Sequence, residues 1–149
     1  MPAAEEALDQ DGQPPEVTWP YDDARDSWAA SYQPPSVAGA EAKRRQLNGG
    51  EVLLPTVVMV RDALDRGRPV VLGIRLHATW HGVGADGRVA LPASGARDLG
   101  GHAVLVVGYR ANDFVVQNSW GSDWGEDGFA YLPDDYVDRF AVAAWSLAL

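Results

Sequence analysis

A pair of apolar segments separated by a short polar stretch constrains the fold of this chain more than any other feature. It lies within GGHAVLVVGYRANDFVVQNSWGSDWGEDG, residues 100–128. Residues 103–109 contain consecutive large apolar side chains, a pattern typical of a strand that is buried on both faces. Residues 114–117 form a second candidate strand, and the polar residues 110–113 connect the two. The pattern therefore predicts an antiparallel hairpin.

This hairpin would bring His102 and Asn118 together. The two residues are 16 positions apart (118 − 102 = 16), which suits two strands of about seven residues and a short turn. An amide oxygen that accepts a hydrogen bond from one imidazole nitrogen fixes the ring and leaves the other nitrogen for proton transfer. The pair thus has the chemistry of a general base and its orienting partner, which are two members of a nucleophile–base–orienter set.

Glycine and tryptophan residues surround the pair. Gly100 and Gly101 precede the histidine, so the backbone can turn there and present the imidazole to a cleft. Trp120 and Trp124 follow the asparagine, and an indole beside the amide would lower the local dielectric constant and strengthen its hydrogen bond. The alternative role for the two indoles is to pack the core, and both roles can hold, because packed indoles would also shield the hydrogen bond of Asn118. The alternative for the histidine, taken alone, is a hydrogen-bonded core residue.

At these residues the chain resembles a known family. The segments GGHAVLVVGY and NSWGSDWGEDGFAYLP are similar to the C-terminal half of papain-like cysteine peptidases, in which the histidine and asparagine of this pattern complete a Cys-His-Asn triad. The resemblance implies an α+β, papain-like fold that is incomplete. Residues 51–149 would form an antiparallel β half-barrel with peripheral helices, and residues 1–50 would be a remnant of the helical lobe with the interlobe segment.

The resemblance also assigns roles to individual residues. His102 and Asn118 would be catalytic, with Gly101, Trp120 and Trp124 in support. In the family, the strand expected at residues 70–76 and the loop before the histidine border the substrate groove. The candidate groove residues are therefore Gly73, Ile74 and Gly100.

The chain departs from the family in one respect, because it contains no cysteine. It therefore lacks disulfides, thiolate metal ligands and a cysteine nucleophile. The glutamine that forms the family's oxyanion hole cannot be located either, and no serine lies on a glycine-rich turn into a long helix.

Three interpretations remain. The chain would be the His- and Asn-bearing part of a peptidase whose Cys-bearing part is upstream, on a partner chain or lost by truncation, and an apolar surface would then be exposed where that part docks. Alternatively, it would be a catalytically inactive module that binds extended peptides or a protein partner by strand addition. The third possibility is a structural or regulatory subunit.

Charge and composition exclude several kinds of partner. The net charge is −9, from 21 acidic and 12 basic residues, which argues against nucleic acid and anionic membranes as partners. The resemblance implies a peptide or protein substrate. No segment has the roughly 20 consecutive apolar residues of a membrane span, and the N-terminus lacks the features of a signal peptide, so a cytoplasmic location is the default expectation. Lys43 is the only lysine, and this arginine bias is typical of GC-rich bacterial genomes.

No cofactor or metal is expected. His77 and His81 have the i, i+4 spacing of a helical metal site, but Gly82 and Gly84 indicate a loop and no third ligand is evident.

The rest of the chain predicts further elements. A helix begins after the N-cap Thr56 and stops at Gly67. Residues 36–47 are ambiguous, and Asn48-Gly49-Gly50 is the most plausible internal boundary. The other expected elements are short helices at 3–8, at 22–31 and near 133–135, and strands at 70–76, 88–91, 129–132 and 140–147.

Overall fold

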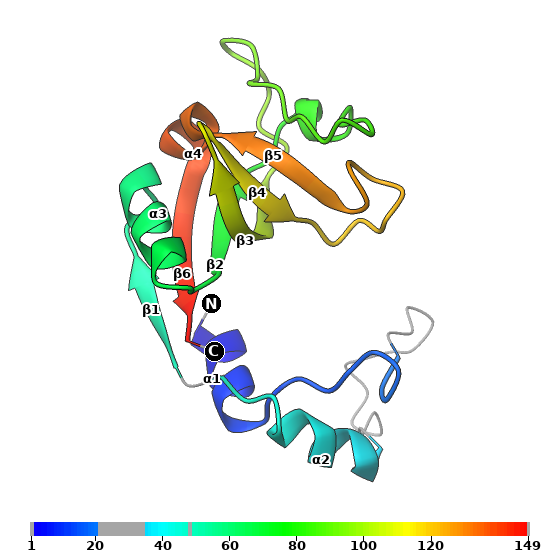
Figure 1. Ribbon diagram of the computed structural model, residues 1–149. Coiled ribbons are helices and arrows are strands. Elements are labelled where there is room, and N and C mark those ends of the chain that lie inside the picture. Colours follow the sequence, from blue (N-terminus) through cyan, green and yellow to red (C-terminus); the bar gives the residue numbers. More distant parts are fainter. Residues whose placement is uncertain (1, 21–34, 48, 149) are drawn as a thin grey trace. The chain divides into compact units, whose positions relative to one another are not determined.

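The chain forms two compact units. The computed structural model describes residues 2–20, 35–47 and 49–148 (Figure 1). Contacts group residues 1–50 into one unit and residues 51–148 into the other. The helix expected at residues 22–31 lies outside the described residues.

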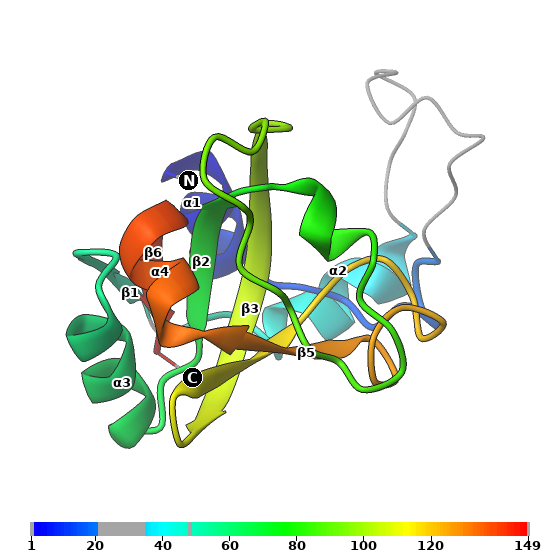
Figure 2. The same ribbon diagram turned by 90° about the horizontal axis from the view of Figure 1, so that it is seen from above.

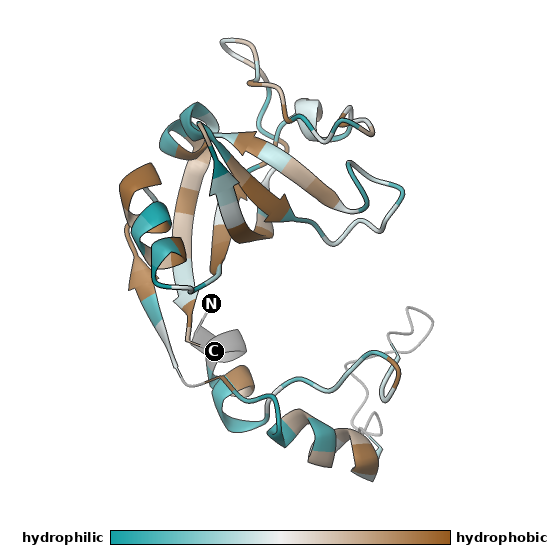
Figure 3. Ribbon diagram, in the orientation of Figure 1, coloured by the Kyte–Doolittle hydropathy of each residue, from teal (hydrophilic) through white to brown (hydrophobic). Residues whose placement is uncertain are grey.

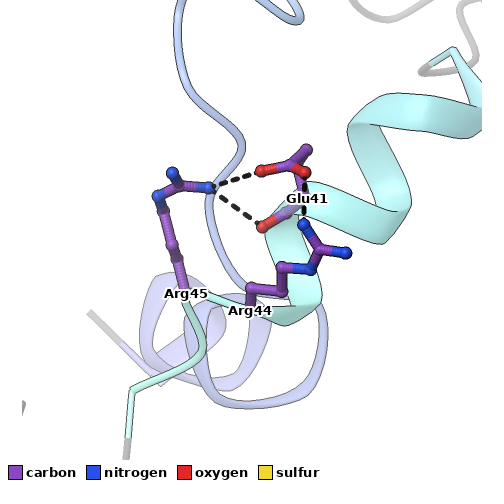
Figure 4. A network of polar contacts seen from close by, with 3 residues as sticks. All are labelled: Glu41, Arg44 and Arg45. Carbon is purple, nitrogen blue, oxygen red and sulfur yellow. Dashed lines mark hydrogen bonds and ion pairs between the residues drawn. The ribbon is translucent and has the colours of Figure 1, made fainter.

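The first unit contains two helices, α1 (Pro2–Gln10) and α2 (Ser36–Lys43). The ambiguous segment after residue 35 is therefore helical over its first eight residues. Ala38 and Ala42 are its buried side chains. On the exposed side, Glu41 accepts hydrogen bonds from Arg44 and Arg45 at 2.8 and 3.1 Å (Figure 4).

The second unit is built on an open six-stranded sheet with the strand order β1-β6-β2-β3-β4-β5 (Figures 1 and 2). β2 pairs antiparallel with both β6 and β3, and the β3–β4 and β4–β5 pairs are antiparallel as well. Its strands are β1 (Gly50–Leu53), β2 (Val70–Arg75), β3 (Gly101–Arg110), β4 (Asp113–Gln117), β5 (Phe129–Pro133) and β6 (Ala141–Leu147).

Two helices, α3 (Val57–Asp65) and α4 (Asp134–Phe140), lie on one side of this sheet (Figure 2). The predicted N-cap is confirmed, because Oγ1 of Thr56 accepts a hydrogen bond from the amide of Met59. Gly67, just beyond the helix, has a positive φ of 73°, as expected of a C-terminal glycine. Side chains from both helices and from alternate strand positions form one apolar core: Val60, Ala63, Leu72, Ile74, Val104, Val106, Phe114, Val116, Leu132, Tyr136 and Val137.

The predicted hairpin is present as β3 and β4. Arg110 pairs with Asp113 across a two-residue turn, in which Ala111 has a positive φ of 46°. The register then shifts once, because Val106 pairs with Val116 and Gly108 with Val115, so Val107 is an extra residue on β3.

The expectation that β3 is buried on both faces is wrong. Val104 and Val106 are buried in the core, but Val107 on the other face is 41% exposed and Ala103 is also exposed. A continuous apolar sequence does not show which faces of a strand other elements cover. In the described residues, neither α3 nor α4 covers the second face of β3. Figure 3 shows that hydrophobic residues are nevertheless concentrated on the strands of the sheet.

Two further expectations need correction. Residues 88–91 form no strand, since they contribute a single bridge between Arg88 and Tyr131. β1 was not expected, because its glycine-rich start favoured a turn. The strands at β2, β5 and β6 and the helix after Pro133 agree with the predictions to within a few residues. None of the described helices is long and apolar enough to cross a membrane.

Candidate active site

The hairpin places His102 and Asn118 on the same face of the sheet. Residues directly opposite in an antiparallel pair point to one face, and neighbours along a strand alternate between faces. Leu105 pairs with Gln117, so Asn118, the next residue, takes the face of Val104 and His102. Nε2 of His102 lies 2.9 Å from Oδ1 of Asn118. Gln117 is exposed, as expected for the opposite face.

The hydrogen bonds define which imidazole nitrogen carries the proton. Oδ1 of Asn118 also accepts from the backbone N–H of Ser119 at 2.8 Å, which identifies it as the amide oxygen. Because that atom is an acceptor, Nε2 of His102 must be the donor. In the neutral ring, Nδ1 then has no proton and carries the lone pair needed for a base. The Nδ2 atom of Asn118 is buried and has no partner among the described residues.

Three indoles enclose this pair. The ring of Trp120 lies 5.0 Å from the ring of His102, and Trp124 meets Trp120 edge to face at 5.5 Å. Trp80 stacks on Trp124 at 5.8 Å, and its carbonyl accepts a 2.9 Å hydrogen bond from Nε1 of Trp124. Trp80 is fully buried and its ring is 6.0 Å from the imidazole of His102. The imidazole of His102 therefore lies against an apolar aromatic wall.

Sequence reasoning missed Trp80 and its neighbour His81 as parts of this site. Trp80 ends a short 3₁₀ turn (Ala78–Trp80) and His81 follows it, within a long connection that has no helical or strand periodicity. The only signal was the composition of HATWH, a large aromatic residue between two histidines. His81 stacks on Trp120 with ring centroids 5.1 Å apart and planes 2° from parallel.

His77 has a different role from His81. It is 4% exposed, and its Nδ1 lies 3.0 Å from the hydroxyl of Tyr136. That hydroxyl donates to the carbonyl of Arg75 at 2.9 Å, so Nδ1 of His77 must donate to Tyr136. Burial raises the pKa of Tyr136 to about 12. The network ties the start of the 76–81 segment to α4, and within the described residues no group of three His, Asp or Glu side chains is placed to hold a metal.

The backbone immediately before His102 is held by Asp98. One carboxylate oxygen accepts the amide of Gly100 at 2.8 Å, and the other pairs with Arg75 at 2.5 Å. The hydrogen bond from Gly100, followed by that from Arg75, lowers the pKa of Asp98 from its ordinary value. The carbonyl of Gly100 in turn accepts the amide of Leu76 at 2.8 Å.

The candidate groove residues differ in how exposed they are. Ile74 is fully buried, so its side chain is in the core and presents no surface to a ligand. A Cβ on Gly73 would lie 3.3 Å from Cβ of Ala143, so the close approach expected there is to β6. Gly100 is exposed, and a Cβ at Gly100 or Gly101 would meet nothing within 4 Å.

An open hollow of about 310 Å³ lies on the face of the sheet away from α3 and α4, across the sheet from the side chain of His102. Its lining combines apolar strand residues with the polar end of β4. The lining residues are Val71, Ala103, Val104, Leu105, Gln117, Asn118 and Ser119.

Comparison with known proteins identifies the fold. The model of the papain family of cysteine proteases matches residues 10–144. The chain belongs to the papain family of cysteine peptidases. Its open antiparallel sheet with flanking helices is an incomplete form of the papain-like α+β fold.

Individual relatives extend this comparison. Over 82 residues the chain is 40% identical to an uncharacterized peptidase C1-like protein of Acanthamoeba polyphaga mimivirus, an alignment that covers 52% of this chain and 26% of the viral protein. Xylellain, a cysteine protease from Xylella fastidiosa, superimposes with a TM-score of 0.77 and 28% identity over 96% of this chain and 59% of xylellain. Procathepsin L 3 of Tenebrio molitor superimposes with a TM-score of 0.72 and 23% identity over 99% of this chain and 47% of that protein, which supports the fold alone. This papain-family chain thus spans only part of each relative.

Proposed function

We propose that this chain is the His- and Asn-bearing part of a papain-like cysteine peptidase. His102 is the general base, Asn118 orients it, and the cysteine nucleophile is supplied by a polypeptide outside this chain. The observation that carries the proposal is the 2.9 Å contact between Nε2 of His102 and Oδ1 of Asn118, with the amide oxygen fixed by Ser119.

The proposed reaction uses the remaining nitrogen of His102. Nδ1 takes the proton of the partner's thiol, and the thiolate attacks the carbonyl carbon of the substrate's peptide bond. The imidazolium then returns a proton to the leaving amine as the carbon–nitrogen bond breaks and an acyl-thioester forms. Water then gives a proton to Nδ1 as its oxygen attacks the thioester carbonyl. The carbon–sulfur bond breaks, the carboxylic acid product leaves, and the imidazolium returns the proton to the thiolate. Asn118 holds the ring in one orientation through these transfers, because it binds only Nε2.

The aromatic wall supports this role. Trp120 and Trp124 exclude water from the side of the imidazole that faces the asparagine, and a hydrogen bond in a medium of lower dielectric constant is stronger. A histidine that served only to fill the core would be hydrogen-bonded and almost fully buried, as His77 is. His102 is half-buried, which is consistent with one accessible edge.

The open face of the sheet supports an external partner. Val71, Ala103 and Leu105 line the hollow beside Asn118, and the exposed Val107 continues this apolar strip along β3. Exposed apolar surface of this kind is typical of a site that another polypeptide covers.

Complementation tests the proposal. The coding DNA upstream and the neighbouring genes are first read for a helix that carries a cysteine, and that polypeptide is produced together with this chain. We expect cleavage of a fluorogenic peptide that thiol reagents block and that His102→Ala reduces by about 10²- to 10⁴-fold, as for loss of a general base. Arg66→Ala, an exposed side chain just beyond α3 and outside the lining of the hollow, is the control and retains activity.

Two outcomes would overturn the proposal. Cleavage that His102→Ala leaves unchanged would exclude the histidine as the base. Peptide binding without turnover, insensitive to thiol reagents, would instead establish the inactive papain-like module that binds extended peptides or a protein partner.

A further inference from the structure

The indole of Trp120 contacts two imidazoles. It lies 5.0 Å from His102 with the rings tilted by 35°, and 5.1 Å from His81 with the rings within 2° of parallel. His81 is exposed, whereas Trp120 and His102 are partly buried. One exposed histidine is therefore joined to the proposed base through a single indole.

The backbone around Trp120 gives this indole little regular support. The segment between β4 and β5 contains no helix or strand, and Gly121, Gly125, Asp127 and Gly128 all have positive φ. Backbone hydrogen bonds such as that from the amide of Asn118 to the carbonyl of Gly128 hold the loop, and the ring contacts orient the indole within it. Trp124 meets it edge to face on the inner side and is itself anchored by the carbonyl of Trp80. His81, the exposed residue that follows the 3₁₀ turn, provides a parallel contact.

The buried indole and the exposed imidazole are neighbours in sequence, at the end of the 3₁₀ turn and directly after it. Trp80, fully buried, ends the turn and packs on Trp124, and His81 follows immediately and packs on Trp120. The backbone at this point is held by the amide of His81, which donates to the carbonyl of Ala78 at 3.1 Å. The position of His81 is thus fixed by the buried core, so its ring can restrain a neighbour.

We propose that His81 is a positioning residue that holds the Trp120 indole over the His102–Asn118 hydrogen bond. Stacking reduces the motion of the indole and so limits the entry of water to the Nε2–H of His102. The catalytic consequence rests on the proposed function above, but the structural claim concerns this chain alone and is tested without a nucleophile.

Three substitutions separate stacking from other properties of the side chain. His81→Phe keeps a flat aromatic ring, His81→Leu keeps similar bulk without one, and His81→Ala removes both. The readout is the rate at which the Nε2 proton of His102 exchanges with water, measured by NMR on labelled chain. Thermal unfolding of each variant shows that it remains folded.

The expected result is specific to the ring. Exchange is about two- to tenfold faster in the Ala and Leu variants, the factor that corresponds to one aromatic pair. The Phe variant stays within about twofold of the unsubstituted chain. The indole N–H resonance of Trp120 shifts in the Ala and Leu variants and stays near its original position in the Phe variant. If the Nε2 proton exchanges too fast to follow, the indole N–H shift of Trp120 alone tests the proposal.

Two results would overturn the proposal. Exchange and indole shift that are unchanged in the Ala and Leu variants would show that His81 does not restrain Trp120. A Phe variant that behaves like the Ala variant would show that stacking is not the cause. Either failure leaves the His102–Asn118 hydrogen bond itself detectable, whereas failure of the proposed catalytic pair is seen separately, as peptide cleavage that survives His102→Ala.

In the complemented enzyme a further readout distinguishes positioning from substrate binding. Loss of the stack is expected to lower kcat while KM changes little, because the indole acts on the base. Restoration of kcat by His81→Phe would accompany the restored exchange rate.

Discussion

Oδ1 of Asn118 receives two hydrogen bonds, one from the imidazole of His102 at 2.9 Å and one from the amide of Ser119 at 2.8 Å. The second contact prevents the amide group from turning over and offering its NH₂ to the ring. The imidazole can therefore hydrogen-bond the asparagine only as the Nε2–H tautomer. A backbone group two residues beyond β4 thus determines which nitrogen of the histidine is basic.

Asn118→Ala is expected to remove this tautomer preference. The ¹⁵N chemical shifts of neutral His102 should report Nε2–H alone in the unsubstituted chain and a mixture of both tautomers in the variant, because no acceptor remains at Nε2. Gln117→Ala, which alters the neighbouring exposed side chain, should leave the shifts unchanged. Identical shifts in the Asn118→Ala variant and the original chain would contradict the prediction.

Tyr136→Phe is expected to destabilise the second unit by about 1–3 kcal/mol, because the Nδ1–H of His77 and the carbonyl of Arg75 would both lose a buried partner. Urea denaturation measures the change. Tyr109→Phe is the control, since the hydroxyl of Tyr109 is exposed and bonds only Asp65 among the described contacts, and its effect should stay within about 0.5 kcal/mol.

The effect of Tyr136 also depends on pH. Its folded pKa of about 12 is above the ordinary value of 10.0, so folding favours the neutral phenol. The resulting stabilisation is fully present below pH 10 and declines as the pH rises through 12. The difference in unfolding free energy between the original chain and Tyr136→Phe should therefore shrink above pH 10, and a constant difference would refute the assignment.

Asp98→Asn is expected to destabilise the segment before His102 at neutral pH but not in acid. The pKa of Asp98 is below its ordinary value of 3.8, so its contribution is present above that pH and is lost as the pH falls through the lower folded pKa. Hydrogen exchange at the amide of Gly100 measures it locally. The variant and the original chain should differ at pH 7 and converge in strong acid, whereas a difference that persists in acid would exclude the carboxylate as its source.

Gly73→Val is expected to destabilise the sheet by about 1–3 kcal/mol, because the added carbons would press β2 against Ala143 of β6. Gly101→Val is the control, as Gly101 on the neighbouring strand β3 has no atoms within 4 Å of an added Cβ. Equal unfolding midpoints for the two variants would show that contact of the added side chain with Ala143 does not destabilise the sheet.

The local part of the site was predictable from the sequence. Two candidate strands, a short turn and a separation of 16 residues suffice to bring His102 and Asn118 to the same end of one hairpin, whereas their common face depends on the extra residue Val107. The N-cap at Thr56 was equally local. These features depend on neighbours in sequence, where patterns are informative.

The non-local part was not predictable. Trp80 and His81 reach the site through a connection without periodicity, and their position depends on packing against Trp124 and Trp120, more than 35 residues away. The burial of Ile74 and the exposure of Val107 likewise depend on which face α3 and α4 cover, a choice that strand composition does not encode.

The extra residue Val107 has a consequence for insertions and deletions in this hairpin. If the pairing of Arg110 with Asp113 continued without the shift, Asn118 would come opposite Leu105 and share its outward face. The extra residue shifts the pairing of the two strands by one position, and this shift puts Asn118 and His102 on the same face of the sheet. A single codon gained or lost between the turn and Asn118 could leave a foldable sheet and still separate the two residues. The number of residues between the turn and Asn118 therefore matters to the site as much as their identity.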